Sequence, residues 1–277
     1  MLRSVLVGLD GSPYSTAAVE LGVQWAQRAQ ALFVGLGIID EPTICAPEAV
    51  SLGGTAYKVR RDANLVAEAR MQVQGFLAHC AERCTAAAVA SLLHEETGLP
   101  ADCILAQAQY CDVILLGQQT HFHFATQDGA DETLRTVLKS CPRPVVAVPT
   151  TVREGHAVVI AYDGSLQAAR TLQMLPAIAP YDLQEVHVVS IHAQQAAAVH
   201  CAERAVEFLR RHHITAQPYA MATTAAPAAV LLEHIEHVQA SLLVMGAYGQ
   251  PVLREFFFGS VTRTLLEESP VPLFLYH

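Results

Sequence analysis

Short, nearly continuous apolar runs alternate with longer amphipathic stretches along the whole chain. In the first half, the pattern predicts strands near 2–9, 32–39, 89–94, 112–117 and 144–148, and helices near 13–30, 64–84, 100–110 and 130–140. The second half predicts strands near 156–162, 185–191, 216–222, 240–246 and 272–276. Strands that are apolar at successive positions are covered on both faces, as in a parallel sheet flanked by helices. We therefore expect an α/β fold of the doubly wound type.

The chain also contains an internal repeat. Residues 5–12 (VLVGLDGS) align with residues 158–165 (VVIAYDGS), 153 positions further along. Later segments align at an offset of about 129, so the first copy carries extra residues at about 41–64. We expect two tandem domains, 1–150 and 155–277, joined by a short polar linker. The extra segment is either a lid over the first copy's cleft or a plain surface excursion, and loop statistics favour the excursion.

Composition narrows the class of protein. Of the 277 residues, 52% are hydrophobic and 16% are charged, so the chain can bury a large core. No apolar run reaches the roughly 18 residues that a membrane helix needs, and the opening segment meets Asp10 too early for an apolar targeting sequence. The net charge of −9, with no basic stretch, argues against nucleic acid as a partner. We expect a cytoplasmic protein that binds neither membrane nor nucleic acid.

A glycine-rich loop in the second copy is the best candidate for a binding site. The apolar run 241–245 leads into Gly246-Ala-Tyr-Gly249, and nine residues later Gly259-Ser260 precede a helical pattern. Glycines after a strand let the backbone approach an anion, and the following helix start offers free N–H groups to a phosphate. Asp163 ends another strand at the same sheet edge, where it can accept from sugar hydroxyls or help to hold Mg²⁺.

These residues resemble a known family. The stretch 246–261 matches the G-x2-G-x9-G-[ST] signature of the ATP-binding branch of the universal stress protein family. Asp10 and Asp163, the closing Pro-x-Pro strands of both copies and the segment 96–105 are also similar to that family, and the resemblance covers nearly the whole chain. It implies two domains, each a five-stranded parallel sheet of order 3-2-1-4-5 with helices on both faces. Pairing through the last strand would make an intramolecular pseudo-dimer or, alternatively, a homodimer.

The resemblance further implies that the second domain binds ATP, with or without Mg²⁺. Asp163 and the backbone before it would meet the adenosine, Ile191 would contact adenine, and the later residues would line the ribose and phosphates. The implied contacts are Ala161, Tyr162, Asp163, Ile191, Met245, Gly246, Gly249, Gly259, Ser260 and Val261.

The first copy departs from this pattern. Its loop Gly117-Gln-Gln-Thr120 lacks the second glycine and continues with two histidines, at 121 and 123. The next helix begins near Asp131-Glu132, and two carboxylates at a helix start satisfy its dipole and repel a triphosphate. We therefore expect an empty or altered first site, although Asp10-Gly11-Ser12 is retained.

The function predicted from these patterns is a nucleotide-dependent stress-response regulator or interaction module. The chain has no P-loop lysine, so any ATP hydrolysis should be slow, and no catalytic residue is assigned. Two alternatives remain: an ATP-using transferase or adenylating enzyme, and a nucleotide-free scaffold. The paired histidines 121/123 and 234/237 lack further ligands at suitable spacing, so no metal site is assigned. Seven scattered cysteines form no disulfide framework and are expected to be reduced.

Overall fold

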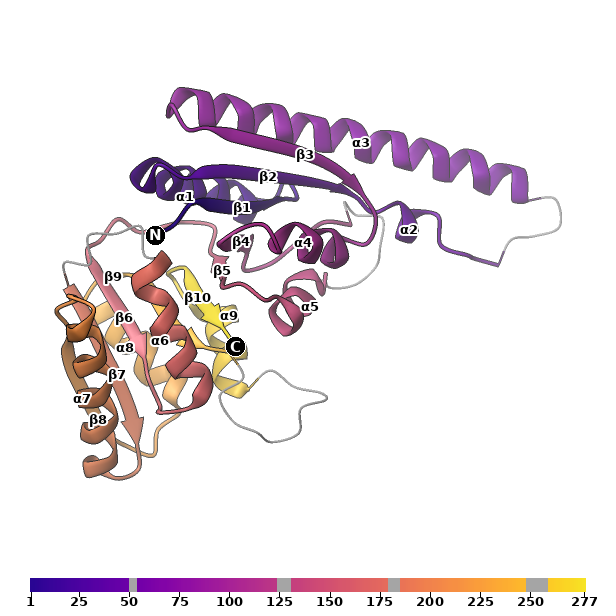
Figure 1. Ribbon diagram of the computed structural model, residues 1–277. Coiled ribbons are helices and arrows are strands. Elements are labelled where there is room, and N and C mark those ends of the chain that lie inside the picture. Colours follow the sequence, from indigo (N-terminus) through magenta and orange to yellow (C-terminus); the bar gives the residue numbers. More distant parts are fainter. Residues whose placement is uncertain (50–53, 124–130, 179–184, 248–258) are drawn as a thin grey trace. The chain divides into compact units, whose positions relative to one another are not determined.

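A computed structural model describes residues 1–49, 54–123, 131–178, 185–247 and 259–277. Contacts divide the chain into two compact units (Figure 1). The N-terminal unit is residues 3–142, and the C-terminal unit is residues 143–277 together with residues 1–2. Each unit has its own strands and helices, and each is described separately below.

The N-terminal unit has a parallel sheet of strand order β3-β2-β1-β4. Its elements are β1 (Ser4–Leu9), α1 (Pro13–Ala29), β2 (Leu32–Ile39), α2 (Glu41–Ile44), α3 (Thr55–Ala86), β3 (Ser91–Thr97), α4 (Pro100–Ala108), β4 (Val113–Gly117) and α5 (Thr133–Ser140). The central strands β1 and β4 are buried along nearly their whole length, as their continuous apolar runs predict.

The C-terminal unit has the strand order β8-β7-β6-β9-β10-β5. Its elements are β5 (Val145–Val148), β6 (Ala157–Ala161), α6 (Leu166–Ile178), β7 (Glu185–His192), α7 (Gln195–Arg211), β8 (Gln217–Ala222), α8 (Pro227–His237), β9 (Ala240–Gly246), α9 (Ser260–Glu268) and β10 (Leu273–Tyr276). The five strands of the second repeat are parallel and follow the order 3-2-1-4-5. The doubly wound α/β fold predicted from the sequence is confirmed.

Strand β5 belongs to the first repeat in sequence but lies in the C-terminal unit. It pairs antiparallel with β10, with Leu273 opposite Ala147 and Leu275 opposite Val145. All four of these side chains are buried. The closing strands of the two repeats are therefore paired, as the family resemblance implied, and the division between the units falls before β5.

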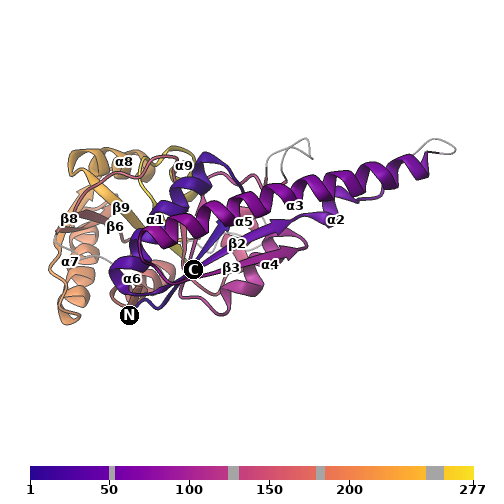
Figure 2. The same cartoon turned by 90° about the horizontal axis from the view of Figure 1, so that it is seen from above.

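The extra segment of the first repeat is largely helical. Helix α3 has 32 residues and begins at Thr55, well before the expected start near 64. Figures 1 and 2 show α3 lying along β2 and β3 and continuing past the ends of these strands. The short helix α2 is anchored because Ile44 packs into a buried cluster with Ile39 of β2 and with Ala69 and Val73 of α3. Residues 55–61 are exposed or half-buried, so this part of the extra segment is a helical excursion on the surface.

Candidate functional site

Asp163 stands just beyond the carboxyl end of β6, in the turn that leads to α6. Its Oδ1 accepts from the Ser165 N–H at 2.9 Å, and the Ser165 hydroxyl oxygen accepts from the Ala168 N–H at 3.2 Å, which caps α6. Gly164 between them has φ of +78°, a left-handed conformation that favours glycine. The turn thus fixes one carboxylate oxygen and leaves the Asp163 side chain exposed to solvent.

Three strand ends of the C-terminal unit meet around this turn. Strand β6 lies between β7 and β9, with Ala161 opposite both Val189 and Met245. Tyr162 N donates to the Val189 carbonyl at 2.9 Å, so the backbone leaving β6 stays close to β7. Ile191, near the end of β7, is half-buried. The predicted contacts at the ends of β6, β7 and β9 are therefore brought to one edge of the sheet.

Gly246 at the end of β9 is required by packing. A Cβ at this position would lie 2.5 Å from Ala168 N and 2.6 Å from the carbonyl carbon of Gln167, in the first turn of α6. Gly117 has the same role in the N-terminal unit, where a Cβ would lie 2.5 Å from Tyr14 Cβ and 2.6 Å from the Gln119 carbonyl oxygen. Both repeats need a glycine here for helix packing, so this glycine alone does not indicate a phosphate site.

The remaining predicted contacts lie at the start of α9. Gly249 is outside the described residues, as is the rest of 248–258. Gly259 and Ser260 are exposed, Val261 is half-buried, and the N-cap residue is Gly259, so among the described residues no side-chain cap is seen at the helix start. A Cβ at Gly259 would meet no atom within 4 Å. The first N–H groups of α9 thus have no intrahelical acceptor, which is the usual state of a helix start that binds an anion or water.

The equivalent aspartate of the N-terminal unit is enclosed. Asp10 is 4% exposed, and its two oxygens accept from Ser12 N at 2.9 Å and from His121 N at 2.7 Å. Burial raises the pKa of the Asp10 carboxyl. The start of α5 is also occupied, because Asp131 accepts from Thr133 N at 2.8 Å and from Phe122 N at 2.7 Å. In this unit the loop that follows β4 therefore donates to the carboxylates at the edge of the sheet.

Aromatic rings fill the same edge of the N-terminal unit. Phe122 is fully buried, and its ring lies against Gly8 of β1, where an added Cβ would be 3.0 Å from Cζ. The ring of Phe76, from α3, covers Gly11 so closely that an added Cβ would be 2.1 Å from its Cζ. At Gly164 of the second repeat, the neighbouring side chain is the smaller Cys201, 3.3 Å from an added Cβ. The sequence predicted the blocking carboxylates but not Phe76, which comes from a distant helix.

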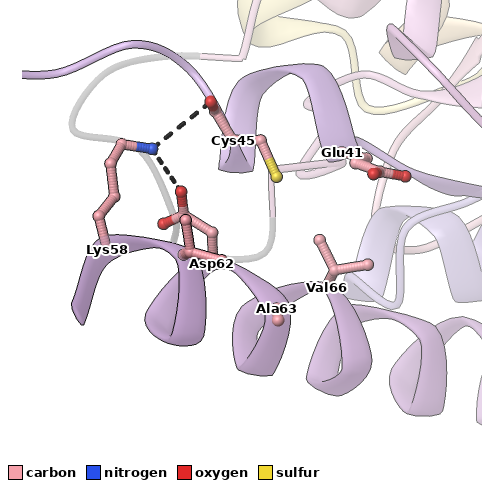
Figure 3. A pocket seen from close by; sticks show the side chains of 7 residues that line it. Glu41, Cys45, Lys58, Asp62, Ala63 and Val66 are labelled. Carbon is pink, nitrogen blue, oxygen red and sulfur yellow. Dashed lines mark hydrogen bonds and ion pairs between the residues drawn. The ribbon is translucent and has the colours of Figure 1, made fainter. Parts of the chain in front are cut away.

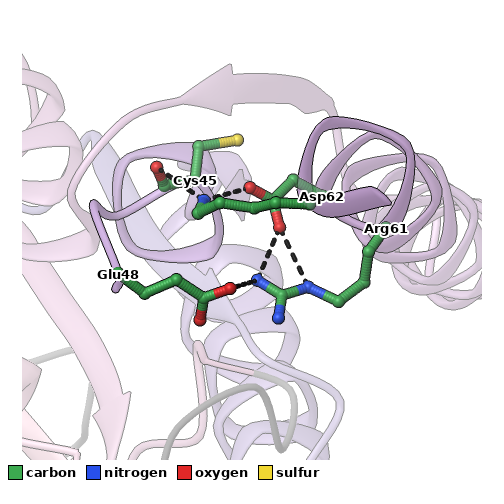
Figure 4. A network of polar contacts seen from close by, with 5 residues as sticks. Cys45, Glu48, Arg61 and Asp62 are labelled. Atoms are coloured by element: carbon green, nitrogen blue, oxygen red, sulfur yellow. Dashed lines mark hydrogen bonds and ion pairs between the residues drawn. The ribbon is translucent and has the colours of Figure 1, made fainter. Parts of the chain in front are cut away.

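The extra segment forms a pocket of about 500 Å³ between α2 and the first turns of α3 (Figure 3). It is lined by Glu41, Cys45, Lys58, Val59, Asp62, Ala63 and Val66. The Lys58 ammonium binds Asp62 and reaches the Cys45 carbonyl oxygen at 3.5 Å. Figure 4 shows the Arg61 guanidinium joining Asp62 to Glu48, each at 2.8 Å. Bonding to Lys58 and Arg61 lowers the pKa of the Asp62 carboxyl, and the network ties the start of α3 to the end of α2.

Other candidate chemistry is limited within the part of the chain that the structure describes. Burial raises the pKa of the Cys80 thiol to about 12, and burial also raises that of Cys84, so neither is a ready thiolate at neutral pH. Across the described ranges, no three His, Cys, Asp or Glu side chains are grouped to hold a metal ion. The helices in these ranges include none that is long and apolar enough to span a membrane.

The fold defines a doubly wound α/β protein with two tandem repeats, in which the aspartate at the sheet edge is buried in the first repeat and exposed in the second. The sequence profile described as "Universal stress protein family" matches residues 1–149 and 156–277. The chain therefore belongs to the universal stress protein family, with two copies of the family domain.

Individual relatives agree with this assignment. Universal stress protein Slr1230 of Synechocystis is 24% identical over 183 residues, which span 65% of this chain and 63% of that protein, less than two thirds of its length. A universal stress protein from Archaeoglobus fulgidus shows the same fold, with a TM-score of 0.73, 18% identity, and coverage of 99% of this chain and 97% of that chain. Another universal stress protein was solved in complex with cAMP; it is 20% identical over 54% of this chain and 98% of its own, with a TM-score of 0.35.

Proposed function

We propose that the chain binds an adenine nucleotide, ATP, at the carboxyl edge of the C-terminal unit and acts in the cytoplasm as a nucleotide-dependent regulator or interaction module of a stress response. One observation carries the proposal. Asp163 is exposed, and its Oδ2 has no hydrogen-bond partner among the described residues, whereas the same oxygen of the equivalent Asp10 accepts from His121 N at 2.7 Å. The second repeat thus offers an acceptor that the first repeat uses for its own loop.

The two helix starts support the same conclusion. In the N-terminal unit the Asp131 carboxylate accepts from the first turn of α5, which leaves no need for an external anion. In the C-terminal unit α9 begins at Gly259-Ser260, and no side chain of the described residues caps it. A sugar hydroxyl at Asp163 and a phosphate at α9 would therefore supply the partners that the protein itself supplies in the first repeat.

The proposed contacts follow the two parts of the ligand. Ala161, Tyr162, Asp163 and Ile191 would hold the adenosine, while Met245, Gly246, Gly249, Gly259, Ser260 and Val261 would line the ribose and phosphates. Any Mg²⁺ would be held mainly by the nucleotide phosphates and water. No catalytic residue is proposed, and hydrolysis would be slow at most.

Isothermal titration of the whole chain with ATP tests this function, with ADP, AMP and cAMP as comparison ligands. We expect one ATP to bind per chain, because Asp163 is exposed whereas the first sheet edge is filled by Phe76 and Phe122. Two equivalents per chain would contradict the assignment of a filled first site. No binding of any of the four nucleotides would favour the scaffold alternative, and rapid turnover with an acceptor would favour the transferase.

A further inference from the structure

Two histidines of the C-terminal unit are buried against each other beneath α8. His187 on β7 is 2% exposed and His234 on α8 is 8% exposed, with ring centroids 5.4 Å apart in an edge-on arrangement. The Tyr219 ring on β8 stacks on His187 at 4.9 Å and lies 4.7 Å from His234. The three rings thus form one cluster, here called the histidine cluster, between α8 and the strands β7 and β8.

The cluster has few hydrogen bonds. His187 Nε2 lies 2.9 Å from a Glu185 carboxylate oxygen, which favours a proton on that nitrogen. His187 Nδ1 and His234 Nε2 are both buried without a partner among the described residues. The Tyr219 hydroxyl donates to Gln217 at 3.0 Å instead of to either imidazole. A neutral imidazole leaves a bare acceptor at a small cost, but a protonated one would bury an unpaired N–H⁺, which costs far more.

The charged groups around the cluster offer little compensation. On β7 the Glu185 carboxylate faces His187, but its side chain is half exposed and solvent screens it. On α8 the other titratable side chains are Glu233, Glu236 and His237, all exposed; Glu236 is bonded to Arg153, and His237 lowers the pKa of His234 further. Strand β9 has no titratable side chain, and on α9 Arg263 is paired with Glu267. Burial, followed by the nearby His187 and His237, lowers the pKa of His234.

We propose that the histidine cluster is an acid-sensitive latch, in which protonation of the His187–His234 pair loosens α8 from β7 and β8. Two cations with ring centroids 5.4 Å apart would repel each other in a site from which water is largely excluded. Helix α8 runs through Val238 and Gln239 directly into β9, which ends at Met245 and Gly246. Loosening α8 would therefore reach the sheet edge, and only this last consequence rests on the proposed nucleotide site.

The sign of the pH effect follows from proton uptake. The unfolded chain protonates its histidines near pH 6.5, whereas the folded state keeps His234 neutral to a lower pH. The folded state therefore loses no stability through His234 above pH 7. The loss grows as the pH falls through 6.5 towards the pKa of His234 in the folded state. Over this interval, because His234 stays neutral in the folded state, the unfolding equilibrium constant rises by up to tenfold per pH unit.

The test measures urea unfolding between pH 7.5 and 5 for the wild type, for His234→Phe and for the control His237→Gln. His234→Phe keeps a ring in the cluster but cannot be protonated, so we expect its pH slope to fall by close to one proton. His237 is exposed on the same helix and lowers the pKa of His234 less than burial does, so its variant should keep most of the wild-type slope. Equal slopes for the wild type and His234→Phe would overturn the proposal.

A second measurement decides the matter if His234→Phe does not fold. Imidazole resonances of the wild type, followed by NMR across the same pH range, should show His234 titrating below the ordinary range, together with faster hydrogen exchange in α8 after correction for the intrinsic rate. Ordinary titration of His187 and His234 with unchanged protection of α8 would overturn the proposal. Neither measurement involves a nucleotide, so a failure here is separate from a failure of the proposed function.

Discussion

Replacing Gly246 by valine is expected to destabilise the C-terminal unit severely, whether or not a nucleotide is present. The added Cβ would overlap the backbone of α6, 2.5 Å from Ala168 N and 3.0 Å from Ala168 Cα, and backbone atoms cannot rotate away as a side chain can. Overpacking of this kind costs about 3 kcal/mol or more. Urea unfolding followed by circular dichroism measures the loss. The equivalent Gly117→Val should show a similar loss in the N-terminal unit, because Tyr14 and the Gln119 carbonyl lie as close there.

Gly259→Ala is the matched control for this prediction. Gly259 has φ of −54°, which alanine adopts freely, and no atom lies within 4 Å of the added Cβ. We expect the unfolding free energy to stay within about 0.5 kcal/mol of the wild type. ATP affinity should fall, since the methyl group would stand at the start of α9 where the phosphates are proposed to bind. Wild-type stability of Gly246→Val would show that the contact with α6 is not rigid.

The sequence predicted the fold well because its signal is local and repeated. Every strand of both repeats appears within a few residues of its expected range, and the central strands are marked by the continuous Val, Ile and Leu runs of strands buried on both faces. The start of α3 was misplaced. Residues 55–63 carry Lys58, Arg60, Arg61 and Asp62 and almost no apolar periodicity, so nothing marked them as helical. This part of the helix is also held by bonds from Lys58 to the Cys45 carbonyl oxygen and from Arg61 to Glu48, residues that follow α2 and are not part of the helix's own pattern.

The candidate site was predictable in part. Asp163 and the start of α9 could be found because strand, turn and helix signals place them at one edge. Gly246 illustrates the limit of such reasoning. A glycine after a strand is compatible with a bound anion and also with a closely packed helix. The packing of α6 against Gly246 is a tertiary contact, which the local sequence does not indicate. The filling of the first edge by Phe76 was likewise hidden, because Phe76 and Gly11 are far apart in sequence and Phe76 occupies an ordinary position of an amphipathic helix.

The two sheet edges show how one fold gives two outcomes. Both repeats keep the Asp-Gly-Ser turn and the glycine that ends the fourth strand of the repeat. In the N-terminal unit His121 and Phe122 donate their backbone N–H groups to Asp10 and Asp131. The loop after β4 thus provides the hydrogen-bond donors for these carboxylates. Asp10 therefore has a structural role in the first repeat, whereas Asp163 is available for a ligand in the second. Replacing each aspartate by asparagine exchanges one oxygen for an amide nitrogen and separates the two roles.

Asp163→Asn is expected to weaken ATP binding by about tenfold or more, because a charged acceptor contributes roughly 1.5–3 kcal/mol to a hydrogen bond with a sugar hydroxyl. The asparagine oxygen can still accept from Ser165 N, so the turn and the stability should persist. In Asp10→Asn, the amide group would place N–H donors against the N–H of Ser12 or His121. That variant should lose about 1–3 kcal/mol of stability and keep wild-type ATP affinity. Paired titration calorimetry and urea unfolding measure both effects. If ATP affinity fell in Asp10→Asn and not in Asp163→Asn, the nucleotide would belong to the N-terminal unit and the proposed site would be wrong.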